Sequence, residues 1–230
     1  YKFENLYGAE FMCEIKNSKE VKLSDHVRFK CKRCGECCRH VAQTVVIEPI
    51  DAYNMSKYLR LEISKFYEKY TNMYLLKNTV FPVFTLKTIS NDDACIFLKG
   101  NRYSIQDSKP KTCRLYPFWV YPSENGFVYN YTTERSHHPN GSLVKVKDWM
   151  RDYFRDDEKE ALNAEQLLIP QIAGILKALK PYSISNWEFI LSKTLKYRHF
   201  AYDLTKPFQP QFEANMKELI EILNERLKTK

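Results

Sequence analysis

The chain has 230 residues and a formal net charge of +8, and 44% of its residues are hydrophobic. This length suffices for one large domain or for a domain with a helical extension, and 16 Tyr and 14 Phe against 6 Gly exclude a disordered chain. Lys and Arg are spread along the whole length, which favours solvated helix faces over a nucleic-acid surface. No apolar run approaches the length of a membrane span, so we expect neither a membrane nor a nucleic acid as a partner.

Seven cysteines are present, and four of them lie within eight residues. A secreted disulfide scaffold is smaller and spreads its cysteines more evenly. This usage therefore predicts a cytoplasmic protein whose thiols are kept reduced for a metal. In the first 28 residues, Cys13 has apolar neighbours and is expected to be a buried structural thiol.

Residues 29–40 hold the cluster itself, with Cys31, Cys34, Cys37 and Cys38. The first three recur at every third residue, a spacing that lets successive thiolates point to one side of a tight turn. Gly35 falls where such a turn often needs a positive φ. A packed core does not require four cysteines in eight residues, whereas a metal site does.

Cys37 and Cys38 are adjacent, and neighbouring side chains are expected to diverge, so both sulfurs rarely reach one small ion. A single tetrahedral zinc would take three of the four thiolates and a ligand from elsewhere. An iron–sulfur cluster is wider, and C-x2-C-x2-C opens the bacterial ferredoxin pattern, but Val41 and Ala42 stand where its fourth cysteine and proline would follow. The other ligands therefore come from far along the chain, or two metal positions exist and Cys38 serves the second.

Beyond the cluster, the residue pattern predicts short elements. These are a strand over 44–47, a helix from Glu48 and Pro49, a second helix over about 62–71, and strand material over 79–89 that Pro82 partly confines to an edge. The apolar stripes of both helices are expected to be core rather than a cofactor site.

The next stretch contains two more cysteines. We predict a strand over 94–98, a hairpin turn over 99–102, and a turn or short helix over 109–118 closed by Pro117. Cys95 and Cys113 then stand at the ends of two short elements, from which they can come back over the first cluster.

A second hairpin and a long helical region complete the chain. The hairpin pairs 118–121 with 127–131, and a loop with His137 and His138 follows it. Helical periodicity then predicts helices over 148–154, 158–168, 170–179, 185–197 and 211–227, with Asn163 among the expected starts. We therefore predict an α+β fold: a small, irregular, metal-stapled domain with short antiparallel strands over residues 1–142, and a helical extension over 143–230 packed on it.

Three separated pieces of the chain agree in order and spacing with one known pattern. They are Cys31, Cys34, Cys37, Cys38 and Arg39; then Cys95, Phe97 and Leu98; then Pro110, Cys113, Arg114, Tyr116 and Pro117. On these residues the chain resembles the YkgJ-type cysteine-cluster family, also called the CxxCxxCC or zinc- or iron-chelating domain, over roughly residues 25–142. Lys109 stands where the family has an arginine.

Two cysteines of the family pattern are replaced in this chain, by Tyr103 and by His138. Either the site is rebuilt with mixed ligands, or one metal position is lost and His138 is a loop residue. We include His138 among the expected ligands, with His137 as the fallback, and leave Tyr103 open.

The resemblance implies a metal centre with the following ligands: Cys31, Cys34, Cys37, Cys38, Cys95, Cys113 and His138. Arg39 and Arg114 each follow a cluster cysteine and are expected to offset the negative charge of the thiolates. The expected cofactor is an iron–sulfur cluster, [4Fe–4S] in first place, or iron, with zinc as the alternative.

The function expected from these residues is that of a metal-cluster protein with a redox or metal-dependent catalytic role. It would act with a redox partner or on a protein substrate. One alternative is a structural zinc module whose helical half binds a protein or nucleic acid. Another is a lysine N-methylase-like enzyme, because a distantly similar Cys-rich domain occurs in the flagellin lysine N-methylase of bacteria. The sequence has no nucleotide-binding glycine motif and no P-loop.

Overall fold

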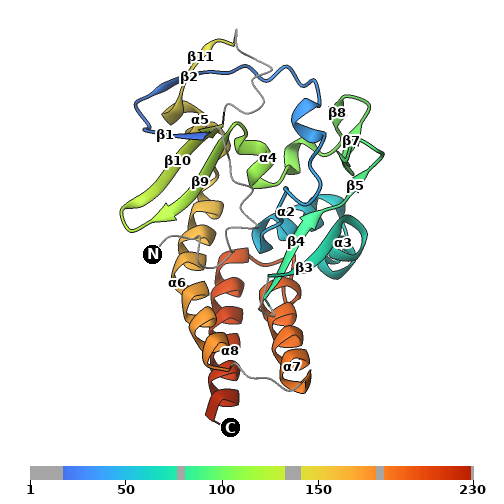
Figure 1. Cartoon of the computed structure of the whole chain (residues 1–230), viewed down its shortest axis with the longest axis vertical. Helices are drawn as coiled ribbons and strands as arrows, with labels where there is room; N and C mark the ends of the chain where they lie inside the picture. The colour runs from blue at the N-terminus through green and yellow to red at the C-terminus, as the bar shows by residue number, and fades with distance from the viewer. Residues whose placement is uncertain (1–17, 77–80, 133–140, 180–183, 229–230) are drawn as a thin grey trace.

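The computed structural model describes residues 18–76, 81–132, 141–179 and 184–228, and the two ends of the molecule differ in character (Figure 1). One end consists of short strands and short helices. The other consists of α6 (Asp156–Ala178), α7 (Ile184–Thr194) and α8 (Phe208–Lys228), which run side by side away from the strands. The predicted α+β class is confirmed.

The described strands all pair antiparallel. β1 (Ser18–Val21), β10 (Gly126–Thr132) and β9 (Phe118–Ser123) form a three-stranded sheet in this order. The two-stranded pairs are β2 (His26–Arg28) with β11 (Leu143–Lys145), β3 (Thr71–Leu75) with β4 (Pro82–Leu86), β5 (Thr88–Ile89) with β6 (Ala94–Cys95), and β7 (Leu98–Lys99) with β8 (Arg102–Tyr103). The hairpins predicted around residue 100 and around residue 125 are therefore present.

Short helices connect these strands. They are the 3₁₀ turn η2 (Glu36–Cys38), α2 (Pro49–Leu59), α3 (Ile63–Tyr70), the 3₁₀ turn η3 (Gln106–Ser108), α4 (Lys111–Leu115) and α5 (Val146–Tyr153). α2 begins at Pro49 as predicted, because a proline in the first turn gives up no helical hydrogen bond. α4 is the short helix expected before Pro117.

Two apolar cores hold the elements together. The larger one contains side chains from both ends of the molecule, such as Phe66, Leu86 and Phe97 from the strand-rich end and Ile172 and Leu219 from the helices. The smaller one lies under the three-stranded sheet and includes Phe118 of β9 and Phe154, which follows α5. The helical region thus packs on the strand-rich region, while a domain boundary after residue 142 stays a prediction.

Four predictions differ from the structure. The helices expected over 158–168 and 170–179 are one helix, α6, with Pro170 inside it, so the helix start expected at Asn163 is wrong. Burial of Ile169 and Ile172 on both sides of the proline outweighs the loss of one hydrogen bond. The strand expected over 44–47 is reduced to one bridge, between Val46 and Thr85.

The third difference concerns residues 94–98, which were expected to form one strand. They are split between β6 and β7, which pair with different partners. The helix expected to end at Tyr197 also changes character, because α7 ends at Thr194 and continues as the π-helix η4 (Leu195–Phe200).

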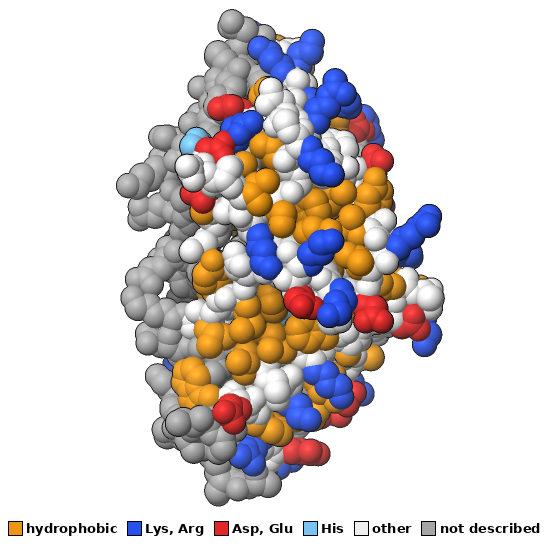
Figure 2. Space-filling model, turned by 90° about the vertical axis from the view of Figure 1, so that its right-hand side faces the viewer, with side chains coloured by type: hydrophobic (Ala, Val, Ile, Leu, Met, Phe, Trp, Pro, Cys, Tyr) orange, Lys and Arg blue, Asp and Glu red, His pale blue; other side chains and the backbone are white. Residues whose placement is uncertain are grey.

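The surface mixes apolar and charged side chains. Figure 2 shows two areas of hydrophobic side chains on one face, separated by a band in which basic and acidic side chains alternate. Large exposed apolar side chains at the strand-rich end include Tyr58, Met73 and Ile89. Within the described ranges, none of the helices combines the length and apolarity that crossing a bilayer requires.

A buried polar chain ties α6 to α3 through η4. Arg198 forms an ion pair with Glu165 (Nη2–Oε1, 2.7 Å), its Nη1 lies 3.0 Å from His199 Nε2, and His199 Nδ1 lies 2.9 Å from Tyr67 Oη. Because a guanidinium only donates, Nε2 accepts and the Nδ1–H donates to Tyr67. Burial, together with the charge of Arg198, lowers the pKa of His199 and keeps it neutral.

This chain predicts a stability change. Replacing Arg198→Leu leaves the Glu165 carboxylate buried without its cation, so we expect the free energy of unfolding to fall by about 3–5 kcal/mol. Urea unfolding followed by circular dichroism measures it. Removing both charges, with Arg198→Leu and Glu165→Leu together, should recover part of the loss, whereas breaking the exposed Lys65–Glu68 pair by Lys65→Ala should change nothing measurable. A single variant as stable as the wild type would contradict this account.

Candidate metal centre

The turn that carries Cys37 and Cys38 is fixed by a close contact at Gly35. Gly35 has φ 78° and precedes η2, as the sequence predicted. A Cβ at this position would lie 3.0 Å from both Asn101 O and Leu98 Cδ1 of the β7–β8 hairpin. Both the backbone conformation and the available space therefore require glycine.

The chain after η2 is fastened to the turn between β5 and β6. The N–H groups of His40 and Val41 donate to the carbonyls of Asp92 (2.8 Å) and Asp93 (3.1 Å). The Arg39 guanidinium binds the Asp92 carboxylate (2.5 Å) and also donates to Asn101 Oδ1 (3.2 Å). The cysteine turn is thus held against the two hairpins that carry Cys95 and Tyr103.

The sulfurs of Cys37 and Cys38 lie on the same side of the turn, 4.0 Å apart. The expectation that these neighbouring side chains diverge is therefore wrong, because the tight 3₁₀ turn brings them together. Two thiolates on one tetrahedral ion with metal–sulfur bonds of about 2.3 Å are separated by about 3.8 Å. The observed separation is close to this value.

Cys95 and Cys113 lie near the same turn. Burial raises the pKa of the Cys113 thiol, and the thiols of Cys95 and Cys37 raise it further. The contact with Cys38 raises the pKa of Cys37, and burial raises it further, whereas burial is the main cause of the raised pKa of Cys95. These mutual effects mean that four thiols from three separated segments share one largely buried region, which we call the inner set.

Tyr103 also faces the inner set. Its side chain is only 8% exposed, and within the described part of the chain its hydroxyl makes no hydrogen bond of normal geometry. Burial raises the pKa of Tyr103, and the thiols of Cys113, Cys95 and Cys38 raise it further. The residue that the sequence analysis left open thus lies among the thiols.

Lys109 is the site residue that the sequence analysis did not single out. Its Nζ lies 4.8 Å from the centroid of the Tyr103 ring. Its charge partly offsets the effects that raise the pKa values of Cys37, Cys95 and Cys113. The sequence feature that could have identified Lys109 is that it is a basic residue at a position where the family pattern has an arginine.

α4, which carries Cys113, is fixed at both ends. At its start, the Lys111 N–H donates to Asp51 Oδ1 (2.7 Å), and Lys111 Nζ pairs with Glu48 Oε2 (2.7 Å). At its end, Arg114 binds the buried Glu158 carboxylate of α6 and donates to the carbonyl oxygens of Lys109 (2.7 Å) and Tyr153 (2.9 Å). Arg39 and Arg114 thus bind carboxylates, and their role in offsetting thiolate charge stays a prediction.

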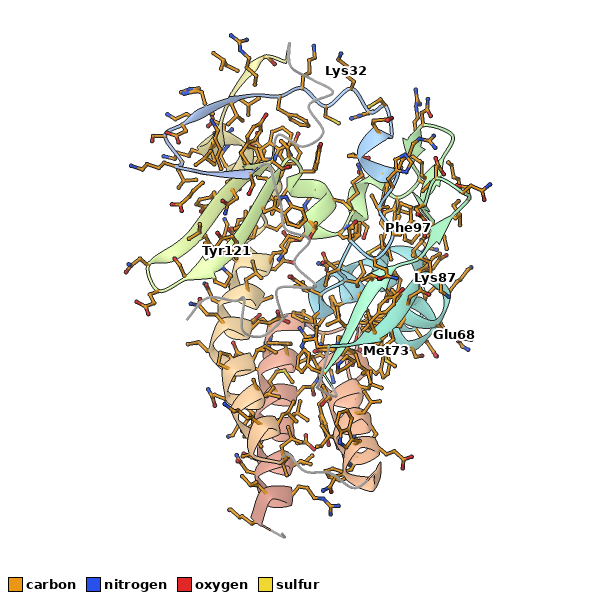
Figure 3. All side chains as sticks on the ribbon, in the orientation of Figure 1. Lys32, Glu68, Met73, Lys87, Phe97 and Tyr121 are labelled. Atoms are coloured by element: carbon orange, nitrogen blue, oxygen red, sulfur yellow. The ribbon has the colours of Figure 1, made fainter. Side chains whose placement is uncertain are left out.

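Cys31 and Cys34 do not join the inner set. Both are exposed, on the loop before η2. In Figure 3, Lys32 of this loop lies at the outer edge of the molecule, whereas Phe97, two residues after Cys95, lies well inside it. We call Cys31 and Cys34 the outer pair.

The remaining candidates, Cys13, His137 and His138, lie outside the described residues. Gly141, three residues after His138, lies within the described residues and is buried. A Cβ on Gly141 would lie 2.7 Å from the carbonyl carbon of Phe29 and 2.8 Å from Lys30 N. The chain after the histidine loop therefore returns to the backbone that leads into Cys31.

The donor groups fit zinc or iron, although they do not form a finished coordination shell. All six described cysteines are free thiols. Among the described side chains, no three Cys, His, Asp or Glu lie close enough together to hold one ion as they stand, so binding requires some of them to turn. Buried thiols that repel one another as thiolates need a cation before they can lose their protons, and a bound metal supplies it.

Comparison with known proteins identifies part of the chain. No solved structure matches it. Residues 30–141, which include the inner set, the outer pair and Tyr103, match the model of the CxxCxxCC family, described as "Putative zinc- or iron-chelating domain". Over these residues the chain is similar to that family of zinc- or iron-chelating domains.

Proposed function

We propose that the chain binds iron through the inner set, as an iron–sulfur cluster in first place, and acts in electron transfer or in metal-dependent catalysis. The observation that carries the proposal is that Cys37, Cys38, Cys95 and Cys113 share one buried region. Four thiolates are the ligand number of a [4Fe–4S] cluster, and a structural zinc site can take the same number, so the two metals are separated by experiment below.

The residues of the site have separate tasks in this proposal. The four inner thiolates hold the metal, and Lys109 balances part of their charge. Phe97, buried and packed against Tyr103 with ring centroids 5.8 Å apart, helps to exclude water, which tunes the reduction potential of a metal centre. A bound iron–sulfur cluster or iron ion supplies one-electron chemistry.

The outer pair provides a second metal position, with His138 as a further ligand. His138 stands three residues before Gly141 in the sequence. Gly141 packs on the residues that precede Cys31. The outer pair is exposed, so this position is the one that a partner can reach.

Zinc in the inner set is the alternative, because the 4.0 Å between the sulfurs of Cys37 and Cys38 suits a tetrahedral ion. The metal would then contribute folding energy only, and the helical region would provide a surface for a protein partner. For the iron protein we expect a redox partner or a protein substrate. Free thiols at these positions favour a reducing compartment, and we place the protein in the cytoplasm.

The first test is the metal content of the full chain purified without oxygen. We expect stoichiometric iron and charge-transfer absorption in the visible, because thiolate ligands transfer charge to iron. Elemental analysis with absorption spectroscopy measures both. A colourless protein with stoichiometric zinc would replace the iron proposal with the structural one, and a protein that takes up neither metal would overturn both.

The second test separates the inner set from the outer pair. Cys37→Ala and Cys113→Ala should each lose the inner metal, because a buried thiolate ligand is removed. Cys34→Ala should retain the inner metal and lose only the outer one, and Cys13→Ala should leave the metal content unchanged. Metal-to-protein ratios of the four variants decide this. Full loss in Cys34→Ala would show that the inner set and the outer pair form one site.

The third test concerns the histidine loop. Replacing His138→Ala should remove the metal bound at the outer pair and leave the inner metal in place, because imidazole is a common ligand for zinc and iron. His137→Ala is the matched control and should have no effect. If His137→Ala rather than His138→Ala loses metal, the ligand has been assigned to the wrong histidine.

A further inference from the structure

The Tyr103 hydroxyl is a buried polar group that lacks the partner it needs. The side chain is 8% exposed, and the hydroxyl has no hydrogen bond of normal geometry to any residue that the structure describes. A buried hydroxyl without a partner destabilises the folded state, and a phenylalanine would fill the same space without that cost. The Cys95 thiol interacts with this hydroxyl, but a thiol is a weak hydrogen-bonding group, so a stronger partner would stabilise the folded state.

The surroundings of the hydroxyl indicate what this partner is. Its neighbours are the thiols of Cys95, Cys113 and Cys38, each of which interacts electrostatically with it. Oxygen and sulfur donors that face one another in a buried space suit a cation between them.

The Tyr103 ring is held in this position by its hairpin. Tyr103 pairs with Leu98 across β7 and β8, and Ser104 N–H donates to the Phe97 carbonyl (2.8 Å). The Phe97 ring packs against the tyrosine ring at 5.8 Å. These contacts keep the phenol directed into the inner set.

A basic side chain lies beside the ring. Lys109 Nζ lies 4.8 Å from the ring centroid, and the backbone of Lys109 is held by the hydrogen bond from Arg114 Nη1 to its carbonyl oxygen (2.7 Å). Lys109 therefore offsets negative charge on the phenolate as well as on the thiolates.

We propose that Tyr103 is a metal ligand whose phenolate oxygen binds a ferric ion of the inner set, beside the thiolates of Cys95 and Cys113. The proposal rests on the proposed function in its form with a bound iron ion, because an iron–sulfur cluster held by the four inner thiolates leaves no position for a phenolate. On binding, the O–H bond of the phenol breaks, an oxygen–iron bond forms and the proton passes to solvent, with no electron transferred. A phenolate is a hard anionic donor, so Tyr103 makes the site more selective for ferric iron than an all-thiolate set.

The experiment uses the full chain, loaded with iron without oxygen and then oxidised, as wild type and as Tyr103→Phe. Wild type should show phenolate-to-iron charge transfer in the visible, with resonance Raman bands of a tyrosine ring that shift when the protein contains ring-deuterated tyrosine. Tyr103→Phe should lack these bands and bind iron at least tenfold more weakly. Tyr70→Phe is the matched control, because the Tyr70 ring packs against the Phe97 ring with centroids 4.7 Å apart. This variant should keep both the bands and the affinity for iron.

The outcomes separate the two proposals. If wild type binds iron but its resonance Raman spectrum contains no tyrosine bands, the ligand assignment is overturned and the proposed function stands. The same conclusion follows if Tyr103→Phe keeps the bands. If wild type binds no iron, both proposals fail. The labelled wild-type protein alone decides the ligand question should Tyr103→Phe fail to fold.

Discussion

The close contact between Gly35 and the β7–β8 hairpin determines where the thiols lie. The backbone at Gly35 has a positive φ and touches Asn101 and Leu98, so η2 can start only at this distance from the hairpin. From there the turn directs the sulfurs of Cys37 and Cys38 to one side. The same hairpin ends in Tyr103, and the strand before it carries Cys95. One backbone contact thus couples residues that are more than 60 positions apart in the sequence.

Charge is the second constraint on the site. A cluster of thiols and a phenol in a buried region is stable while the groups are protonated, and the raised pKa values of Cys37, Cys95, Cys113 and Tyr103 express this. A bound metal favours the deprotonated thiols instead, because each thiolate then faces a cation rather than another thiolate. Lys109 lowers the pKa of three of these thiols, and its single charge offsets only part of the repulsion. The site therefore has the electrostatics of a metal centre, although its ligands still have to turn toward one ion.

Sequence reasoning reached the parts of the site that local rules determine. The spacing of Cys31, Cys34 and Cys37, the glycine at position 35 and the turns around residues 100 and 110 all follow from backbone geometry over a few residues. The prediction that the side chains of Cys37 and Cys38 diverge was wrong. Whether neighbouring side chains diverge depends on the turn that they occupy, which here is a 3₁₀ turn. The division into an inner set and an outer pair could not be predicted, because it depends on which hairpins pack against the loop.

The fold shows the same limit at a larger scale. Helical periodicity correctly indicated a helical second half, but Pro170 was taken as a break. A local rule assigns a cost to the proline, whereas burial of Ile169 and Ile172 against the rest of the core decides the outcome. Likewise, the β-branched residues at 44–47 do not extend into a full strand but form one bridge, between Val46 and Thr85 of β4.

The helical region also takes part in the site, although it has no cysteine. Cys113 stands on α4, a helix of five residues that is too short to be stable alone. Its position is set by buried charges on both sides: Lys111 is bound to Glu48 and Asp51 of the α2 region, and Arg114 is bound to Glu158 of α6. Because removing one partner of such a buried pair strongly destabilises the folded protein, α6 helps to fix the position of Cys113 through Arg114. The strand-rich and helical regions therefore depend on each other through α4, and a metal bound to Cys113 would be linked through Arg114 and Glu158 to the packing of the long helices.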